Sequence, residues 1–292
     1  MMFDIAFVGH YTKDTIVYPH GTRTVDGGAF NYGAHVAVRM GLRVAVVTRL
    51  AREDWRVVEG LERLGVAVFA RATPVSTLLR LTYPTANLDE RTIELTSSAG
   101  AFTVGEVADL RARAVAIGAS VRGEVPLGVV EALASHGSML ALDVQGFIRV
   151  VQDGRLTFDA WPDKESVLKH VTVLKSDAVE AQLITAESDR HAAAARLAAL
   201  GPREVLLTHG GGVLVHHDGT FDEAPFVPDQ VRGRSGRGDT CTSAYLSRRL
   251  MASPAEAVRW AAAVTSLKLE AEGPFRRERA EVEALYRRLS NT

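Results

Sequence analysis

The segment from Arg234 to Thr240 combines a glycine-rich turn with one carboxylate, in the order Arg-Ser-Gly-Arg-Gly-Asp-Thr. Helical periodicity in the following residues predicts that a long helix begins here. The first turn of a helix carries unpaired N–H groups and the positive end of the helix dipole, and Gly236 and Gly238 let an anion approach them. Such a turn can hold a phosphate or the charge that develops during phosphoryl transfer. Asp239 is then placed to take a proton from a hydroxyl group, with a plain helix-terminal role as the alternative.

Polar residues also follow other predicted strands. Asp14 lies just after the first strand, and residues 27–31 (Gly-Gly-Ala-Phe-Asn) place a flexible turn before a helix. Residues 208–212 close a later strand with a second flexible turn. Asp177 and Glu180 begin a helix three residues apart, so they share one face and can hold a hydrated Mg²⁺ directly or through water. For Asp177, a helix N-cap is the competing interpretation.

Two common nucleotide-binding motifs are missing from the sequence. The segment at 234–240 lacks the Gly-x-x-x-x-Gly-Lys-Ser/Thr spacing of a Walker A loop. No Gly-x-Gly-x-x-Gly follows the first strand, which counts against a nicotinamide-dependent dehydrogenase.

The elements that must position these residues alternate along the chain. Short apolar runs, typical of strands buried on both faces, are separated by helix-like segments, which predicts a doubly wound α/β fold with a mostly parallel sheet flanked by helices. Ligands of such folds bind beyond the carboxyl ends of the strands. The expected strands are residues 4–8, 44–47, 114–117, 139–142, 171–174 and 205–207. The expected helices are residues 31–40, 54–64, 126–135, 191–200, 240–251, 254–272 and 277–289.

One stretch departs from this alternation. Residues 76–83 and 91–96 alternate polar and apolar side chains, as strands of a sheet with one wet face do, and the turn-rich residues 85–90 separate them. Together with residues 11–25 they predict a small β-sheet lid, formed by segments of about 11–26 and 76–99, on a single domain that spans residues 1–292. An ordinary edge hairpin is the alternative.

The composition excludes several classes of protein. The 292 residues include 34 basic and 35 acidic side chains, so the formal charge of -1 offers no field that favours nucleic acid or anionic lipid. No uncharged run approaches the ~18 apolar residues of a membrane span, and no secretory signal is expected at the N-terminus. A single cysteine cannot form an internal disulfide, which favours a reducing, cytoplasmic location.

Taken in order, the motifs resemble those of the ribokinase-like (PfkB) carbohydrate kinase family over nearly the whole chain. Residues 27–34 resemble its N-terminal signature, and residues 235–240 resemble its C-terminal signature, usually Asp-Thr-x-Gly-Ala-Gly-Asp. Asp177 and Glu180 stand where the family has Asn-x-x-Glu, and residues 208–210 resemble its Thr-x-Gly nucleotide turn. The resemblance implies an α/β body with a β lid over the acceptor, and transfer of the ATP γ-phosphoryl group to an alcohol with the help of Mg²⁺.

The resemblance also implies a role for each matching residue. The general base and the backbone anion hole would be Asp239, Gly236, Arg237 and Gly238. The residues that hold the acceptor's hydroxyl groups would be Asp14, Gly28 and Asn31. The residues along the nucleotide would be Lys175, Thr208 and Gly210, together with Gly236 and Gly238. The residues that order Mg²⁺ would be Glu180 and Asp177.

The sequence departs from the family pattern at several of these positions. Gly233 replaces the first Asp of the C-terminal signature, Asp177 replaces Asn, and the turn after Thr208 is one residue short. Arg237 replaces the usual Ala. Its side chain could supply a cation for the transferring phosphate, like an arginine finger, or only its backbone N–H could matter.

A narrower resemblance concerns the acceptor. Residues 143–149 (Asp-Val-Gln-Gly-Phe-Ile-Arg), 175–181 and 272–275 resemble the myo-inositol kinase branch. Asp143 and Arg149 would then reach the acceptor or a phosphate, with a structural salt bridge as the alternative. The leading acceptor is therefore myo-inositol or a related cyclitol. Other sugars, nucleosides and a non-catalytic binding protein stay open, as does a homodimer through the lid.

Overall fold

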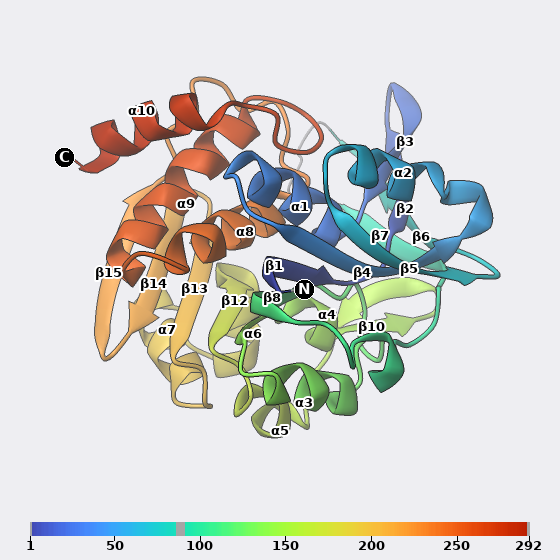
Figure 1. Ribbon diagram of the computed structural model, residues 1–292, viewed down its shortest axis with the longest axis horizontal. Coiled ribbons are helices and arrows are strands. Elements are labelled where there is room, and N and C mark those ends of the chain that lie inside the picture. Colours follow the sequence, from blue (N-terminus) through green and yellow to red (C-terminus); the bar gives the residue numbers. More distant parts are fainter. Residues whose placement is uncertain (1, 86–90, 291–292) are drawn as a thin grey trace.

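Within residues 2–85 and 91–290, which the computed structural model describes, a nine-stranded sheet forms the centre of the molecule (Figure 1). Its strand order is β15-β14-β13-β12-β9-β8-β1-β4-β5. All neighbours from β13 to β5 are parallel, whereas β14 and β15 form an antiparallel extension. The strands are β1 (Phe3–Val8), β4 (Val44–Ala51), β5 (Ala67–Thr73), β8 (Ala112–Ile117), β9 (Met139–Asp143), β12 (Val173–Asp177), β13 (Glu204–His209), β14 (Gly212–His217) and β15 (Thr220–Pro225).

Helices cover both faces of this sheet because its central strands are apolar on both faces. Successive side chains of a strand point to opposite sides, so Ile5 and Phe7 of β1 join one core while Ala6 and Val8 join the other. The helices on the first face are α1 (Ala29–Arg39), α2 (Arg56–Arg63), α8 (Arg237–Arg249), α9 (Pro254–Leu269) and α10 (Arg279–Ser290). Those on the second face are α3 (Leu127–Ser135), α5 (Lys164–Leu168), α6 (Ala178–Thr185) and α7 (Arg190–Ala198).

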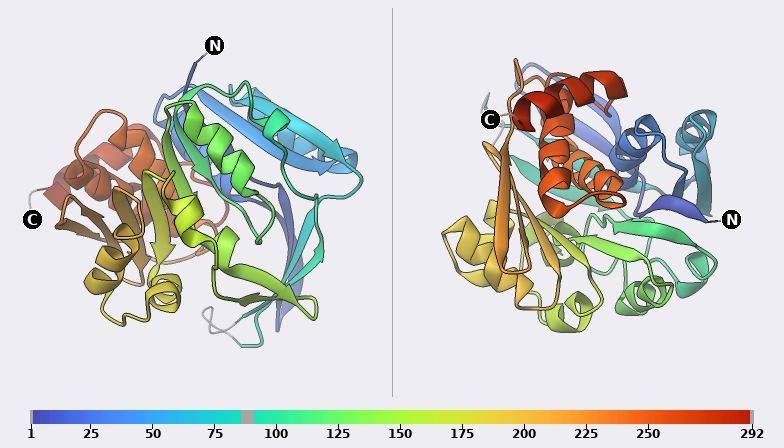
Figure 2. Two further views of the ribbon diagram at one scale, coloured as in Figure 1. Left: turned by 90° about the horizontal axis from the view of Figure 1, so that it is seen from below. Right: turned by 60° about the vertical axis from the view of Figure 1, so that its left-hand side comes forward.

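A second sheet, with six strands in the described part of the chain, lies beside this body (Figure 2). Its strand order is β10-β11-β7-β6-β2-β3. The strands are β2 (Thr12–Tyr18), β3 (Gly21–Gly27), β6 (Thr77–Thr82), β7 (Thr92–Ser97), β10 (Arg149–Gln152) and β11 (Arg155–Phe158). Ile16 pairs with Leu81, and Leu81 pairs with Ile93, so one face of this sheet is apolar. Asp14 lies two residues before Ile16 on β2 and therefore shares that face.

The predicted doubly wound α/β fold is confirmed, and every predicted strand and helix overlaps an observed one. The short helices α4 (Gln145–Ile148) and α5, the strands β5 and β15, and the hairpin of β10 and β11 were not predicted. The last adds residues 149–158 to the second sheet, beyond the expected 11–26 and 76–99. These strands are partly exposed and lack the continuous apolar runs of the central strands, which is why the pattern did not mark them.

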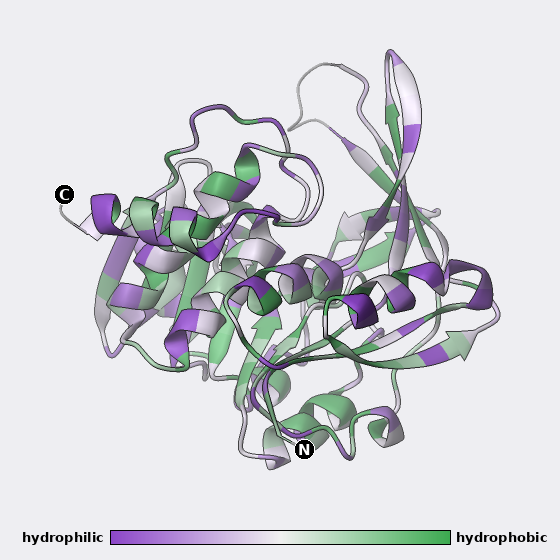
Figure 3. Cartoon of the chain, turned by 45° about the horizontal axis from the view of Figure 1, so that its top comes forward, coloured by the Kyte–Doolittle hydropathy of each residue, from purple (hydrophilic) through white to green (hydrophobic). Residues whose placement is uncertain are grey.

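Hydrophobic residues follow the central strands, and hydrophilic residues gather on the outer surfaces of the helices (Figure 3). Among the described residues, no helix combines the length and the apolar character needed to cross a membrane. Most of residues 85–90, predicted as a turn, lie outside the described residues.

Candidate active site

A cavity of about 680 Å³, called here the first chamber, opens at the carboxyl ends of the central strands. Asp143 ends β9, Asp177 ends β12, and Thr208 stands next to the end of β13. The N-terminus of α8 and the strands β7, β10 and β11 of the second sheet complete its walls. The topology therefore brings together residues that lie almost a hundred positions apart in the chain, at the place where parallel α/β sheets bind ligands.

The N-terminus of α8 is shaped by two glycines. Gly236 has a φ of 72°, in the left-handed region, and a Cβ on it would lie 2.1 Å from the ring of Tyr32. A Cβ on Gly238 would lie 3.0 Å from Nζ of Lys175. A side chain at either position would therefore displace a group that lines the chamber or packs against it.

The same turn leaves two backbone donors free. The N–H of Arg237 donates to the carbonyl of Arg234, and the N–H of Thr240 donates to the carbonyl of Gly236. Among the described residues, the N–H groups of Gly238 and Asp239 have no acceptor. Two adjacent free donors at the positive end of a 13-residue helix form a site for an anion.

Asp239 lies at the third position of α8, next to these donors. Burial raises the pKa of its carboxyl group to about 6, and the nearby carboxylate of Asp143 adds to the rise. At neutral pH the group is ionised but is a stronger base than an exposed aspartate. It can therefore accept a proton from a hydroxyl group held in the chamber.

A buried ammonium group stands under the turn. Nζ of Lys175 lies 2.9 Å from Oδ2 of Asp143 and 3.8 Å from Oε2 of Glu180. Burial by itself lowers the pKa of Lys175, but the two carboxylates outweigh this effect and hold the pKa above its ordinary value. Burial in turn raises the pKa of Glu180 to about 7, against the opposing effect of Lys175. Lys175 therefore places a fixed positive charge against Gly238, where an anion would bind.

Asp177 and Glu180 form a capping box at the start of α6. The N–H of Glu180 donates to Oδ1 of Asp177, and the N–H of Asp177 donates to Oε2 of Glu180. The N-cap interpretation of Asp177 is confirmed. No group of three or more His, Cys, Asp or Glu side chains suited to a metal ion occurs within residues 2–85 and 91–290. These residues do not form a ready-made metal cage, so a Mg²⁺ ion would need the donor's phosphate oxygens as further ligands.

Five arginines, from the second sheet and its flanking residue 91, from the loop before α8 and from α8 itself, line the first chamber: Arg91, Arg149, Arg155, Arg234 and Arg237. Burial lowers the pKa of Arg149 from its ordinary value, although a guanidinium remains charged at neutral pH. With Lys175 they give the chamber six cations against the four carboxylates of Asp143, Asp177, Glu180 and Asp239, an excess of positive charge that suits a polyanionic ligand.

The three residues expected to hold the acceptor, Asp14, Gly28 and Asn31, do not face a single cavity. Asp14 is buried on the inner face of the second sheet, burial raises its pKa to about 6, and its Oδ1 has no partner among the described residues. Gly28 has a φ of 96°, and a Cβ on it would lie 2.4 Å from the carbonyl oxygen of His10. The amide of Asn31 turns away and donates to the carbonyl of Asp26, 3.2 Å distant. Asn31 lines a different cavity.

The neighbour of Asn31, Tyr32, was not predicted as a site residue. Its ring packs against Gly236, and the pKa of its phenol is raised by burial and by the carboxylates of Asp14 and Asp239. Both carboxylates therefore lie close enough to act on the same side chain. The sequence of a glycine turn before a helix does not indicate which of two adjacent polar residues, here Asn31 and Tyr32, packs against the start of α8.

The turn expected to border a nucleotide is short. β13 ends at His209 and β14 begins at Gly212, so only Gly210 and Gly211 connect them. Thr208 lines the first chamber, whereas Gly210 does not. The N–H of Gly211 donates to Nδ1 of His209 and is not available to a ligand.

Comparison with known proteins shows which family the chain resembles. Residues 1–277 match the model of the pfkB family of carbohydrate kinases. A solved structure described as a pyrophosphate-dependent kinase of the ribokinase family, with a pyrophosphate analogue and myo-inositol, is 34% identical, with 96% of this chain and 99% of that chain covered and a TM-score of 0.88. Ribokinase of Arabidopsis thaliana, solved with ribose and ATP, is 20% identical over 98% of this chain and 99% of that chain, with a TM-score of 0.79, and shows the fold alone.

A curated relative, cytidine kinase of Thermococcus kodakarensis, is 26% identical over 276 residues, which cover 87% of this chain and 91% of the relative. The chain therefore belongs to the pfkB carbohydrate kinase family, and it is a phosphotransferase that acts on an alcohol group of a sugar or polyol. The resemblance to the myo-inositol kinase branch is confirmed by the solved structures that match at 34% identity.

Proposed function

We propose that this protein transfers a phosphoryl group to one hydroxyl of a cyclitol, with myo-inositol as the leading acceptor. The observation that carries the proposal is the start of α8, where the free N–H groups of Gly238 and Asp239 adjoin a carboxylate with a pKa of about 6. The solved structure that holds myo-inositol, 34% identical to this chain, supports the choice of acceptor.

In the proposed reaction Asp239 takes the proton of the acceptor hydroxyl as the oxygen attacks the terminal phosphorus of the donor. A new P–O bond forms to the acceptor, and the bond between phosphorus and the leaving phosphate oxygen breaks with its electron pair on that oxygen. The N–H groups of Gly238 and Asp239 would hold the equatorial oxygens of the transferring group, and Lys175 would balance their charge from below. Arg237 is placed on the chamber wall to neutralise the leaving group.

The phosphoryl donor that the geometry favours is inorganic pyrophosphate rather than ATP, which the sequence motifs predicted. Six cations line the first chamber, yet the two-residue turn at Gly210 and Gly211 adds no wall to it. The first chamber therefore offers cations for phosphate groups. The turn at Gly210 and Gly211, which was expected to border a nucleoside, is not part of the cavity. The 34% identical structures described as pyrophosphate-dependent support the same choice.

A divalent ion bound to the donor would neutralise phosphate charge and act as a Lewis acid. Glu180 and Asp177 are the nearest candidates to contact such an ion through water, because the capping box already uses one oxygen of each. The role of these two carboxylates toward Mg²⁺ stays a prediction, as does a homodimer formed through the second sheet.

The experiment is a matrix of donors and acceptors, read by phosphate or ADP release and by the phosphorylated product. Pyrophosphate and ATP are each tested with myo-inositol, other cyclitols, ribose and cytidine. We expect turnover with pyrophosphate and myo-inositol to exceed that with ATP at least tenfold. If cytidine is turned over faster than myo-inositol, the proposed acceptor is wrong. If ligands raise the melting temperature but no donor–acceptor pair is turned over, a non-catalytic binding protein is favoured.

A further inference from the structure

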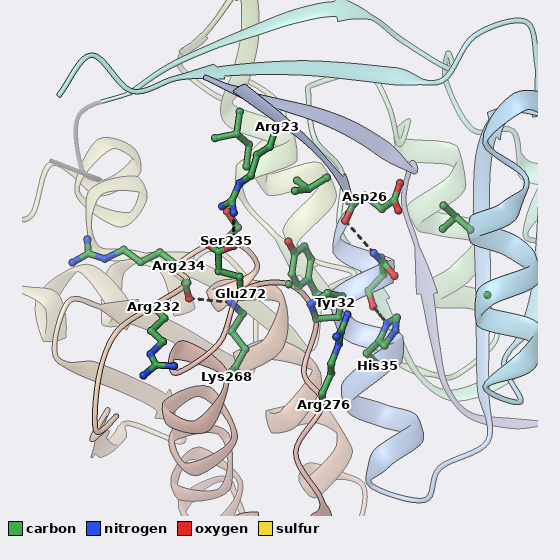
Figure 4. A pocket seen from close by; sticks show the side chains of 18 of the residues that line it. Arg23, Asp26, Tyr32, His35, Arg232, Arg234, Ser235, Lys268, Glu272 and Arg276 are labelled. Carbon is green, nitrogen blue, oxygen red and sulfur yellow. Dashed lines mark hydrogen bonds and ion pairs between the residues drawn. The ribbon is translucent and has the colours of Figure 1, made fainter. Parts of the chain in front are cut away.

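A second chamber of about 450 Å³ lies next to the first (Figure 4). It is bordered by β2 and β3, by α1 and α2, and by residues 232–235 and 268–276. The ring of Tyr32 lines it and packs against Gly236 of the first chamber, so this ring stands between the two cavities. Asp239 and Lys175 line the first chamber and not the second, whereas Arg234 and Ser235 line both.

Positive charge dominates the walls of the second chamber. Its charged lining residues are six cations, Arg23, Arg56, Arg232, Arg234, Lys268 and Arg276, and two anions, Asp26 and Glu272. The two anions are already neutralised. Arg56 donates to both carboxylate oxygens of Asp26, at 2.7 Å each, and Arg23 forms an ion pair with Glu272.

Lys268 is the buried member of this set. Its residue is 2% exposed, and its ammonium group donates one hydrogen bond, of 2.9 Å, to the carbonyl of Gly233. No carboxylate lies within ion-pair distance of it in the described part of the chain. Burial lowers the pKa of Lys268 to about 8, and the carboxylates of Glu272 and Asp239 oppose this effect only in part. An ammonium group with three donors and one protein acceptor has room for a further acceptor in the cavity that it lines.

Arg276 and Arg232 are also uncompensated. Arg276 has no hydrogen-bond or ion-pair partner among residues 2–85 and 91–290. Arg232 donates only to the neutral side chain of Gln230 and, through its backbone, to the carbonyl of Leu269. Three cations from α9 and from two separate loops thus line this cavity, and none of them forms an ion pair within residues 2–85 and 91–290.

We propose that the second chamber binds a small phosphate monoester, with Lys268 and Arg276 as ligands of the phosphate group. Cations that approach from several directions suit a tetrahedral phosphate better than a planar carboxylate, which accepts hydrogen bonds mainly in its plane. The apolar side chains of Ile16, Val25 and Leu61 line the same cavity and provide a wall for the organic part of the ligand. The site does not depend on the proposed donor or acceptor, because it is tested by binding alone.

The experiment is calorimetric titration of the full chain with glycerol phosphate, and with acetate for comparison. We expect glycerol phosphate to bind at least tenfold more tightly than acetate, and Arg276→Ala and Lys268→Met each to weaken binding roughly tenfold, the loss of one charge-assisted hydrogen bond. Arg277→Ala is the matched control, because Arg277 is the next residue but pairs with Glu270 and Glu281 instead. It should bind as the native protein does.

Arg237→Ala separates the two chambers, since Arg237 lines the first but not the second. Binding that survives Arg237→Ala and is weakened by Arg276→Ala supports the second chamber. Binding that is lost with Arg237→Ala and unchanged by Arg276→Ala would assign the ligand to the first chamber and overturn the proposal. Equal affinity for acetate, or no binding at millimolar concentration, would overturn it as well. Arg276 is exposed, so its replacement tests the site even if Lys268→Met does not fold.

Discussion

Replacement of Asp239 by asparagine removes the proposed base while it keeps the size of the side chain. A positioned general base contributes about 10²–10⁴ in rate, so kcat should fall by that factor. Donor affinity should be largely kept, because the free N–H groups of Gly238 and residue 239 belong to the backbone. The same substitution should also make the fold more stable. The loss of activity and the gain in stability both come from removing the buried carboxylate of Asp239.

The magnitude of the second effect follows from the pKa of Asp239. The group moves from 3.8 to about 6 on folding, or about two pH units, and each unit is worth about 1.4 kcal/mol. Folding therefore costs up to about 3 kcal/mol above pH 6, where the carboxylate is charged in both states. Well below pH 3.8 the group is neutral in both states and the cost disappears. The value is an upper bound, because part of Asp239 is accessible from the chamber.

Thermal unfolding measures this cost directly. At pH 7.5 we expect Asp239→Asn to melt on the order of 5 °C above the native protein, and at pH 4 most of this difference should be lost. Asp109→Asn is the control, because it makes the same chemical change at an exposed position and should leave the melting temperature unchanged. A variant with near-native turnover would refute the role of Asp239 as base. A variant that is inactive but no more stable at pH 7.5 would refute the burial argument for its pKa.

Four further outcomes follow from the geometry of the first chamber. The value of kcat/KM should fall about tenfold per pH unit below pH 6, because Asp239 then takes up a proton; a value of kcat/KM that does not change down to pH 5 would contradict this. Lys175→Met should destabilise the protein by about 3–5 kcal/mol in denaturant titration, since it leaves two buried carboxylates without their cation. Gly236→Ala should cost at least 1–2 kcal/mol, roughly, and lower kcat, because an alanine is strained at a φ of 72° and meets the ring of Tyr32. Arg237→Ala should lower kcat by roughly 10- to 100-fold with the KM of the donor nearly unchanged if its side chain neutralises the leaving group, whereas native kcat would show that only its backbone matters.

Much of the fold could be predicted because it depends on local pattern. The apolar runs of the central strands and the amphipathic helices between them are properties of neighbouring residues, and they predicted the α/β body. The start of α8 was predicted for the same reason, since two glycines before a helical pattern define a turn by themselves. The hairpin of β10 and β11 was missed, because its four-residue strands are stable only when β11 pairs with β7, about 60 residues earlier.

The candidate site shows the same division. Spacing alone predicted that Asp177 and Glu180 share a helix face, and left open whether they cap the helix or hold a metal ion. Only the tertiary structure places Lys175 between Glu180 and Asp143 and so supplies the cation from the chain itself. The choice of Asn31 over Tyr32 was equally beyond the sequence, because the direction of each side chain depends on how α1 packs against α8.

The sequence by itself determined the class of fold, the anion-binding turn and the identity of the proposed base, because each is encoded in a few consecutive residues. The tertiary structure alone decided which charges meet. The six cations of the first chamber, and Lys268 of the second, come from segments that are distant in the chain. Electrostatic energy depends on distance in space and on burial, and neither quantity can be obtained from residue order.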